Sequence, residues 1–141
     1  MRRLVIGVGN PDRGDDGAGL EVAGRVRSAP GIRHDNGSYE LMDLWEGADE
    51  VILVDAARSG APVGTIHCIE ANEGALPGGL LATSSHSVGV AETVELARSL
   101  GRLPPRLLIY GIEVSDTTIG GPLSPEVERA IDELVGVIDD A

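Results

Sequence analysis

The sequence predicts a single three-layer αβα domain built around a mostly parallel sheet of about five strands. Short apolar segments typical of buried strands alternate with longer segments whose apolar residues recur at helical spacing. Strands that alternate with helices favour right-handed crossovers and helices on both faces of a parallel sheet. The 141 residues contain no evident linker or internal repeat, so one domain is expected from residue 1 to residue 141.

The first third of the chain predicts two strands, each followed by a helix. Leu4–Val8 is apolar throughout and is expected to be a buried strand. A helix is expected from Gly17 to about Ala29, because apolar residues recur there at helical spacing. Ile32–Asn36 is short and polar, which is typical of an edge strand, and Tyr39–Glu46 again has helical spacing.

The middle of the chain predicts the centre of the sheet. Val51–Val54 is apolar on both faces, the pattern of a central parallel strand, and Asp55 follows it directly. Apolar and polar residues alternate along Thr65–Glu70, which is typical of a strand with one more solvent-exposed face. Ala71–Thr83 is rich in glycine and is expected to be a loop, and a helix is expected from His86 to about Leu100.

The last third predicts one strand and one helix. Arg106–Val114 has the composition of a further strand. Ser124-Pro125-Glu126 is a strong helix start, with serine as the cap and proline in the first turn. The apolar stripe of that helix consists of Val127, Ala130, Ile131, Leu134, Val135 and Ile138.

The composition excludes several classes of protein. Eleven basic and 23 acidic side chains give a net charge of −12, which disfavours binding to nucleic acid or to an anionic membrane. The single cysteine, Cys68, excludes an internal disulfide and is expected to be a small core residue. The apolar run after Met1 breaks too early for a secretion signal, so a cytoplasmic protein is expected.

The loop after the first strand combines glycines with carboxylates. Gly7 and Gly9 form a turn of the kind that presents backbone N–H groups to a phosphate at a helix N-terminus. Asp12 stands where a dinucleotide fingerprint has its third glycine, and Asp15 and Asp16 follow. These carboxylates would repel a phosphate, so the loop is expected to hold a cation.

Three residues from separate segments are candidates for one site. Asp16 follows the first strand, Asp55 ends the central strand, and His86 comes after the long loop. In open α/β sheets, sites form beyond the carboxyl ends of the strands, so these residues are expected to meet there. Two carboxylates and an imidazole suit a borderline divalent cation. Asp15 is expected to cap the first helix or to orient a ligand. The other histidines, His34 and His67, are expected to face solvent or to form local hydrogen bonds.

Several motifs resemble those of one known family in order and spacing. The match runs from Leu4 to about Ile138, and its motifs are Gly7-Val8-Gly9-Asn10, Asp15-Asp16-Gly17-x-Gly19, Ile52-Leu53-Val54-Asp55-Ala56, Ser85-His86-Ser87-Val88-Gly89, Leu108-Ile109-Tyr110-Gly111-Ile112 and Leu123-Ser124-Pro125-x-Val127. The chain resembles the hydrogenase maturation proteases, endopeptidases that trim the large subunit of [NiFe] hydrogenases.

The resemblance implies an activity, a partner and a set of site residues. The activity is removal of a short C-terminal extension from the large-subunit precursor after nickel has been inserted. Asp16, Asp55 and His86 match the residues that grip the nickel already bound in the precursor, and are the candidate catalytic and metal-contacting residues. Nickel is then carried by the substrate, and no permanently bound metal is expected. The precursor is the expected partner of a monomeric chain that binds neither nucleic acid nor membrane.

The chemical step and two other functions stay open at this point. Nickel can polarise the carbonyl or a water molecule, or a carboxylate can act as general base. A metallohydrolase of similar fold with its own divalent metal would contain stoichiometric metal when purified. A non-catalytic assembly factor would bind the nickel-loaded precursor without changing its mass. A nucleotide-binding module is disfavoured by the acidic loop.

At the first ligand position, Asp16 stands where some family members have glutamate. The shorter side chain would require a closer approach of the metal.

Overall fold

The computed structural model describes residues 2–9, 17–35, 39–76, 90–114 and 123–140. Its centre is a five-stranded sheet with the order β2-β1-β3-β5-β4. The strands are β1 (Arg3–Gly9), β2 (Gly31–Asp35), β3 (Glu50–Ala57), β4 (Ile66–Glu70) and β5 (Arg106–Glu113). Only the pairing of β4 with β5 is antiparallel among the described strand pairs, which confirms a mostly parallel sheet.

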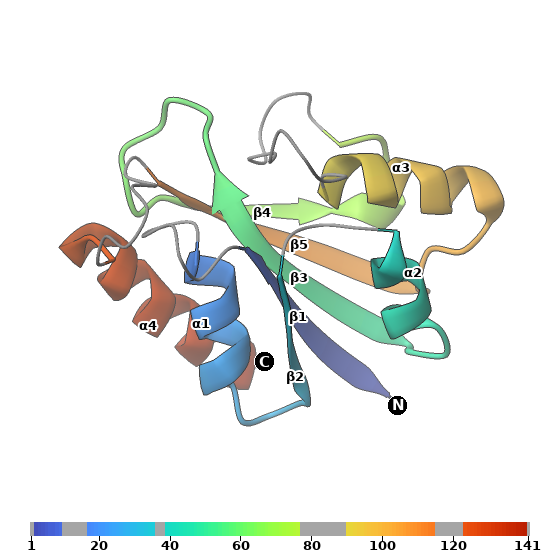
Figure 1. The fold of residues 1–141 in the computed structure, drawn as a ribbon, viewed down its shortest axis with the longest axis horizontal. Helices are drawn as coiled ribbons and strands as arrows, with labels where there is room; N and C mark the ends of the chain where they lie inside the picture. The colour runs from blue at the N-terminus through green and yellow to red at the C-terminus, as the bar shows by residue number, and fades with distance from the viewer. Residues whose placement is uncertain (1, 10–16, 36–38, 77–89, 115–122, 141) are drawn as a thin grey trace.

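Helices cover both faces of this sheet (Figure 1). The helices α1 (Ala18–Arg25) and α4 (Pro125–Asp140) lie on one face. The helices α2 (Glu40–Trp45) and α3 (Val90–Leu100) lie on the other, and a short 3₁₀ helix, η2 (Ala71–Glu73), follows β4. The predicted three-layer αβα architecture is therefore confirmed.

The central strand is buried on both faces, as its apolar sequence predicts. Val51 and Leu53 pack in the layer under α2 and α3, whereas Ile52 and Val54 pack in the layer under α1 and α4. All eight residues of β3 are buried. Because neighbouring strands pair with β3 on both sides, its carboxyl end has a fixed position in the middle of the sheet.

Helix α1 lies unusually close to the sheet, and glycine makes this possible. A Cβ atom on Gly19 would lie 2.6 Å from the carbonyl oxygen of Val8 and would overlap that of Val54. A Cβ on Gly7 would in turn overlap the carbonyl of Gly19. The first turn of α1 is thus packed backbone to backbone against the carboxyl ends of β1 and β3.

Three sequence predictions are wrong in detail. The first helix ends at Arg25 and not near Ala29, because Val26 is extended (φ −67°, ψ 148°) and the chain then turns through Pro30 into β2. Cys68 is exposed and not in the core, because β4 is an edge strand. Residues 71–73 form a 3₁₀ turn in the predicted loop.

Other predictions fall partly outside the described residues. The helix predicted from His86 is seen from Val90 onward, and residues 77–89 are not described. Within the described ranges, none of the helices combines the length and the apolar character needed to cross a bilayer.

Two alanine substitutions in α1 test the close approach to the sheet. Gly19→Ala should destabilise the protein by roughly 1–3 kcal/mol, because the added methyl group collides with strand carbonyls. Gly24→Ala in the same helix should be neutral or stabilise by up to about 1 kcal/mol, because alanine restricts the unfolded chain more than glycine. The nearest atom to its Cβ is 3.8 Å away, on the Arg33 side chain. Urea unfolding measures both, and equal midpoints would contradict the packing described.

Candidate active site at the carboxyl edge of the sheet

Asp55 lies near the carboxyl end of β3, in the middle of the sheet. It pairs with Gly111 of β5, and the preceding residue, Val54, pairs with Gly7 of β1. The residue is only 5% exposed, and its Oδ1 atom accepts a hydrogen bond of 2.8 Å from the backbone N–H of Ala56. A buried carboxylate at this position is consistent with the predicted site at the strand ends.

The other two predicted ligands, Asp16 and His86, lie outside the described residues, as does Asp15. Their nearest described neighbours are Gly17, at the start of α1, and Val90, at the start of α3, and both are buried. Each of these helices begins towards the carboxyl ends of the parallel strands (Figure 1). That these three candidate ligands come together in one site remains a prediction.

Within the part of the chain that the structure describes, no group of three or more histidine, cysteine, aspartate or glutamate residues is arranged to hold a metal ion. Asp55 is the one member of the predicted ligand set in that part.

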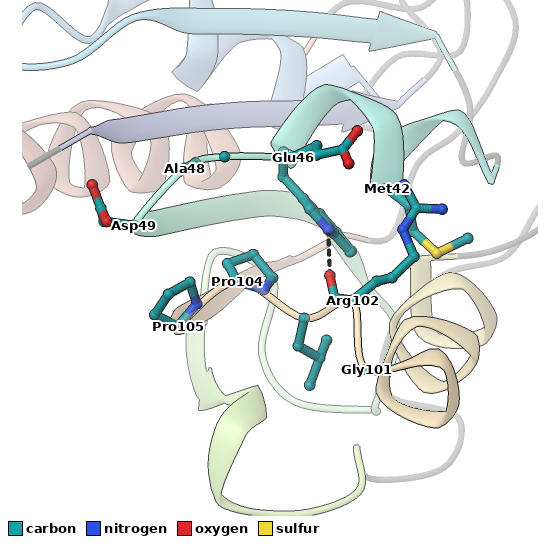
Figure 2. A pocket seen from close by; sticks show the side chains of 11 residues that line it. Met42, Glu46, Ala48, Asp49, Gly101, Arg102, Pro104 and Pro105 are labelled. Atoms are coloured by element: carbon teal, nitrogen blue, oxygen red, sulfur yellow. Dashed lines mark hydrogen bonds between the residues drawn. The ribbon is translucent and has the colours of Figure 1, made fainter.

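Two hollows lie at the opposite, amino end of the strands. One, of about 400 Å³, is lined by residues of α2 and of the segments before β3 and β5, where the indole N–H of Trp45 donates a 2.9 Å hydrogen bond to the carbonyl of Arg102 (Figure 2). The other, of about 330 Å³, lies beside Arg3 and Arg106. Ligands of open α/β sheets bind beyond the carboxyl ends, so neither hollow is the candidate active site.

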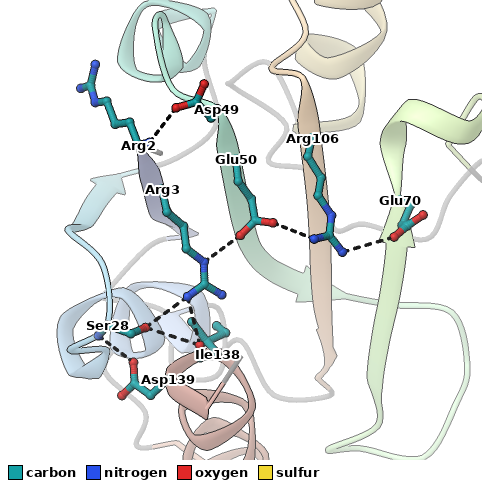
Figure 3. A network of polar contacts seen from close by, with 9 residues as sticks. All are labelled: Arg2, Arg3, Ser28, Asp49, Glu50, Glu70, Arg106, Ile138 and Asp139. Carbon is teal, nitrogen blue, oxygen red and sulfur yellow. Dashed lines mark hydrogen bonds and ion pairs between the residues drawn. The ribbon is translucent and has the colours of Figure 1, made fainter.

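Glu50 fills the space between those two arginines. Its buried carboxylate lies 2.7 Å from Nε of Arg3 and 2.9 Å from Nη1 of Arg106, and Nη2 of Arg106 lies 3.7 Å from Glu70 (Figure 3). The same Arg3 guanidinium donates to the carbonyl of Ile138 in α4 at 3.3 Å. This network ties four strands to the C-terminal helix, and its charges are balanced within the protein.

A second polar cluster lies at the carboxyl edge, and the sequence analysis did not single it out. Glu113, the last residue of β5, accepts hydrogen bonds from the Ser59 hydroxyl at 2.7 Å and the Ser59 backbone N–H at 3.0 Å. Nε2 of His67 in β4 lies 3.0 Å from Oε1 of Glu113 and 3.4 Å from the Ser59 hydroxyl. The local hydrogen bonding expected for His67 is confirmed.

The ionised form of Glu113 is favoured by these contacts. Burial alone would raise the pKa of this carboxyl group, which is 3% exposed. The hydrogen bonds from Ser59 and His67 outweigh burial and lower the pKa below its ordinary value. The carboxylate therefore fastens the segment after β3 to β4 and β5.

The arrangement of Ser59, His67 and Glu113 differs from a nucleophilic triad. In a triad the imidazole uses one nitrogen for the serine and the other for the carboxylate. Here both partners face the same nitrogen, Nε2, and the serine hydroxyl donates to Glu113. The cluster holds the imidazole in place and does not activate the serine.

Comparison with known proteins adds independent information. A family model described as hydrogenase maturation protease matches residues 36–141. The hydrogenase expression/formation protein HupD of Thiocapsa roseopersicina is 32% identical over 136 residues, which cover 91% of this chain and 62% of that relative. The chain thus spans less than two thirds of this relative's length.

Solved structures of similar proteins share the fold. The [NiFe] hydrogenase maturation protease HybD from Thermococcus kodakarensis has a TM-score of 0.75 and 25% identity, with 99% of this chain and 98% of that chain covered. The hydrogenase maturating endopeptidase HybD from E. coli has a TM-score of 0.79 at 24% identity, with 98% and 90% covered.

Replacing Glu113 by glutamine should destabilise the protein at pH 7 by about 1–3 kcal/mol, because the amide is a weaker acceptor than the carboxylate. The folded-state pKa of Glu113 is lowered, so its contribution is present above the unfolded pKa of about 4.5 and is lost as the pH falls through the folded value. The stability difference between wild type and Glu113→Gln should therefore shrink below about pH 4.5. Urea unfolding at several pH values measures this, and a constant difference would contradict the assignment.

Proposed function

The chain belongs to the hydrogenase maturation protease family, and we propose that it removes the C-terminal extension of a [NiFe] hydrogenase large-subunit precursor after nickel insertion. The family is one of proteases, so the reaction is hydrolysis of a peptide bond. The observation that carries the proposal is the buried carboxylate of Asp55 at the carboxyl edge of a sheet with the family's fold.

In this proposal nickel belongs to the substrate. Asp16, Asp55 and His86 contact nickel that the precursor already holds, and the metal thereby brings the scissile peptide to the protease. Fixing a peptide bond beside the catalytic groups supplies much of what proximity requires. Either the nickel polarises the carbonyl or the attacking water, or a carboxylate of the protease acts as general base on the water.

The backbone around Asp55 suits such a role. Its partner on β5, Gly111, is a glycine, so no side chain stands beside the carboxylate on that strand. The tight packing of α1 on β1 and β3 holds the segment that follows Asp16 against the same edge. A rigid frame of this kind is needed where a misplacement of about 1 Å costs on the order of 100-fold in rate.

Intact-mass spectrometry of a nickel-loaded large-subunit precursor, incubated with this protein, tests the function. We expect loss of a discrete C-terminal peptide, and no loss from a nickel-free precursor. Cleavage of the nickel-free precursor would instead favour a metallohydrolase with its own metal. Binding without a change of mass would favour an assembly factor.

Substitution of the three candidate residues tests the site. Asp16→Ala, Asp55→Asn and His86→Ala should each slow processing by at least about 100-fold, because each removes a contact that positions the metal and the peptide. Asp43→Asn is the matched control, since that carboxylate is 75% exposed on α2 and pairs with Arg102. Circular dichroism should show an unchanged fold. Processing at the wild-type rate by any of the three variants would remove that residue from the site.

A further inference from the structure

Asp55 and His67 lie in one row across three strands. His67 of β4 pairs with Gly111 of β5, and Gly111 pairs with Asp55 of β3. Two residues away on each strand, Ile109 and Leu53 before Gly111 and Asp55 and Ile69 after His67 on the antiparallel β4, pack in the layer under α2 and α3. Because side chains alternate along a strand, Asp55 and His67 stand on that same face of the sheet, with no side chain between them at Gly111.

The imidazole of His67 is held in one orientation. Nε2 faces the buried carboxylate of Glu113 at 3.0 Å, so the neutral ring places its proton on Nε2 and its lone pair on Nδ1. The side chain is 23% exposed, so the ring is accessible from solvent. Nδ1 is therefore the atom that can accept a hydrogen bond from a bound molecule.

The spacing of the row decides what His67 can contact. Two strand spacings of about 4.8 Å each separate its Cα from that of Asp55 by about 10 Å. Side chains stand roughly perpendicular to a sheet, so this separation persists above it. One reacting atom cannot touch both side chains over such a distance, whereas an extended peptide advances about 3.3 Å per residue and crosses it in about three residues.

We infer that His67, fixed by Glu113, is a substrate-binding residue whose Nδ1 accepts a hydrogen bond from a backbone N–H of the precursor about three residues from the scissile bond. The inference rests on the proposed function, since it takes the peptide bound at Asp55 as its substrate. It assigns His67 to peptide binding and not to the chemical step.

Two substitutions separate binding from a structural role. His67→Gln places an amide where Nε2 lies, so it can still donate to Glu113, but it has no acceptor where Nδ1 lies. His67→Asn has an amide oxygen near the position of Nδ1 and loses the contact with Glu113. With a nickel-loaded precursor, His67→Gln should raise KM by about five- to tenfold and leave kcat within about twofold, as expected for loss of one hydrogen bond. His67→Asn should recover part of that loss.

Cys68→Ala is the matched control, because this exposed residue neighbours His67 on β4 and points to the opposite face. Its KM should equal that of the wild type. Unchanged KM in His67→Gln, or a larger defect in His67→Asn than in His67→Gln, would overturn the inference while cleavage by the wild type upholds the proposed function. Failure of the wild type to cleave the precursor would overturn both.

Discussion

The arrangement of the protein depends on β3, which is hydrogen-bonded on both sides and covered on both faces. Such a strand cannot shift along its neighbours without exposing apolar side chains, because a one-residue slip exchanges the two faces. Its ends are therefore fixed points of the molecule, and both carry a buried carboxylate. Glu50 is at the amino end and Asp55 is near the carboxyl end.

These two carboxylates have different surroundings and, we argue, different purposes. Glu50 lies between the guanidinium groups of Arg3 and Arg106, so its charge is balanced within the fold. Its removal would leave two arginines without their shared partner, which marks Glu50 as structural. Asp55 lies at the edge where strands β1 and β5 contribute glycines and where two helices begin. The same central strand thus separates a stabilising end from the end at which we propose the active site.

The central strand was predictable, because the apolar residues Val51–Val54 have the pattern of a strand covered on both faces, but the strand does not end at Asp55 as predicted and continues to Ala57. The end of α1 was not, since helical spacing continues past Arg25 while the backbone at Val26 is already extended. The role of His67 could not be read from the chain, because it depends on the antiparallel register of β4 on β5. Cys68 was misjudged because the alternation along Thr65–Glu70 does not show that this strand lies at the edge of the sheet.

Under the proposed function, the charge of the protein also limits how a nickel-loaded precursor can be distinguished from one without nickel. A net charge of −12 attracts cations in general. At physiological ionic strength, however, interactions between exposed charges are screened beyond about 8 Å, so the overall charge cannot resolve one buried metal in a large partner. Discrimination must then come from direct contacts at the carboxyl edge, where partly buried groups are screened much less. A rigidly placed carboxylate such as that of Asp55 meets this requirement, because it need not reorganise when the metal arrives.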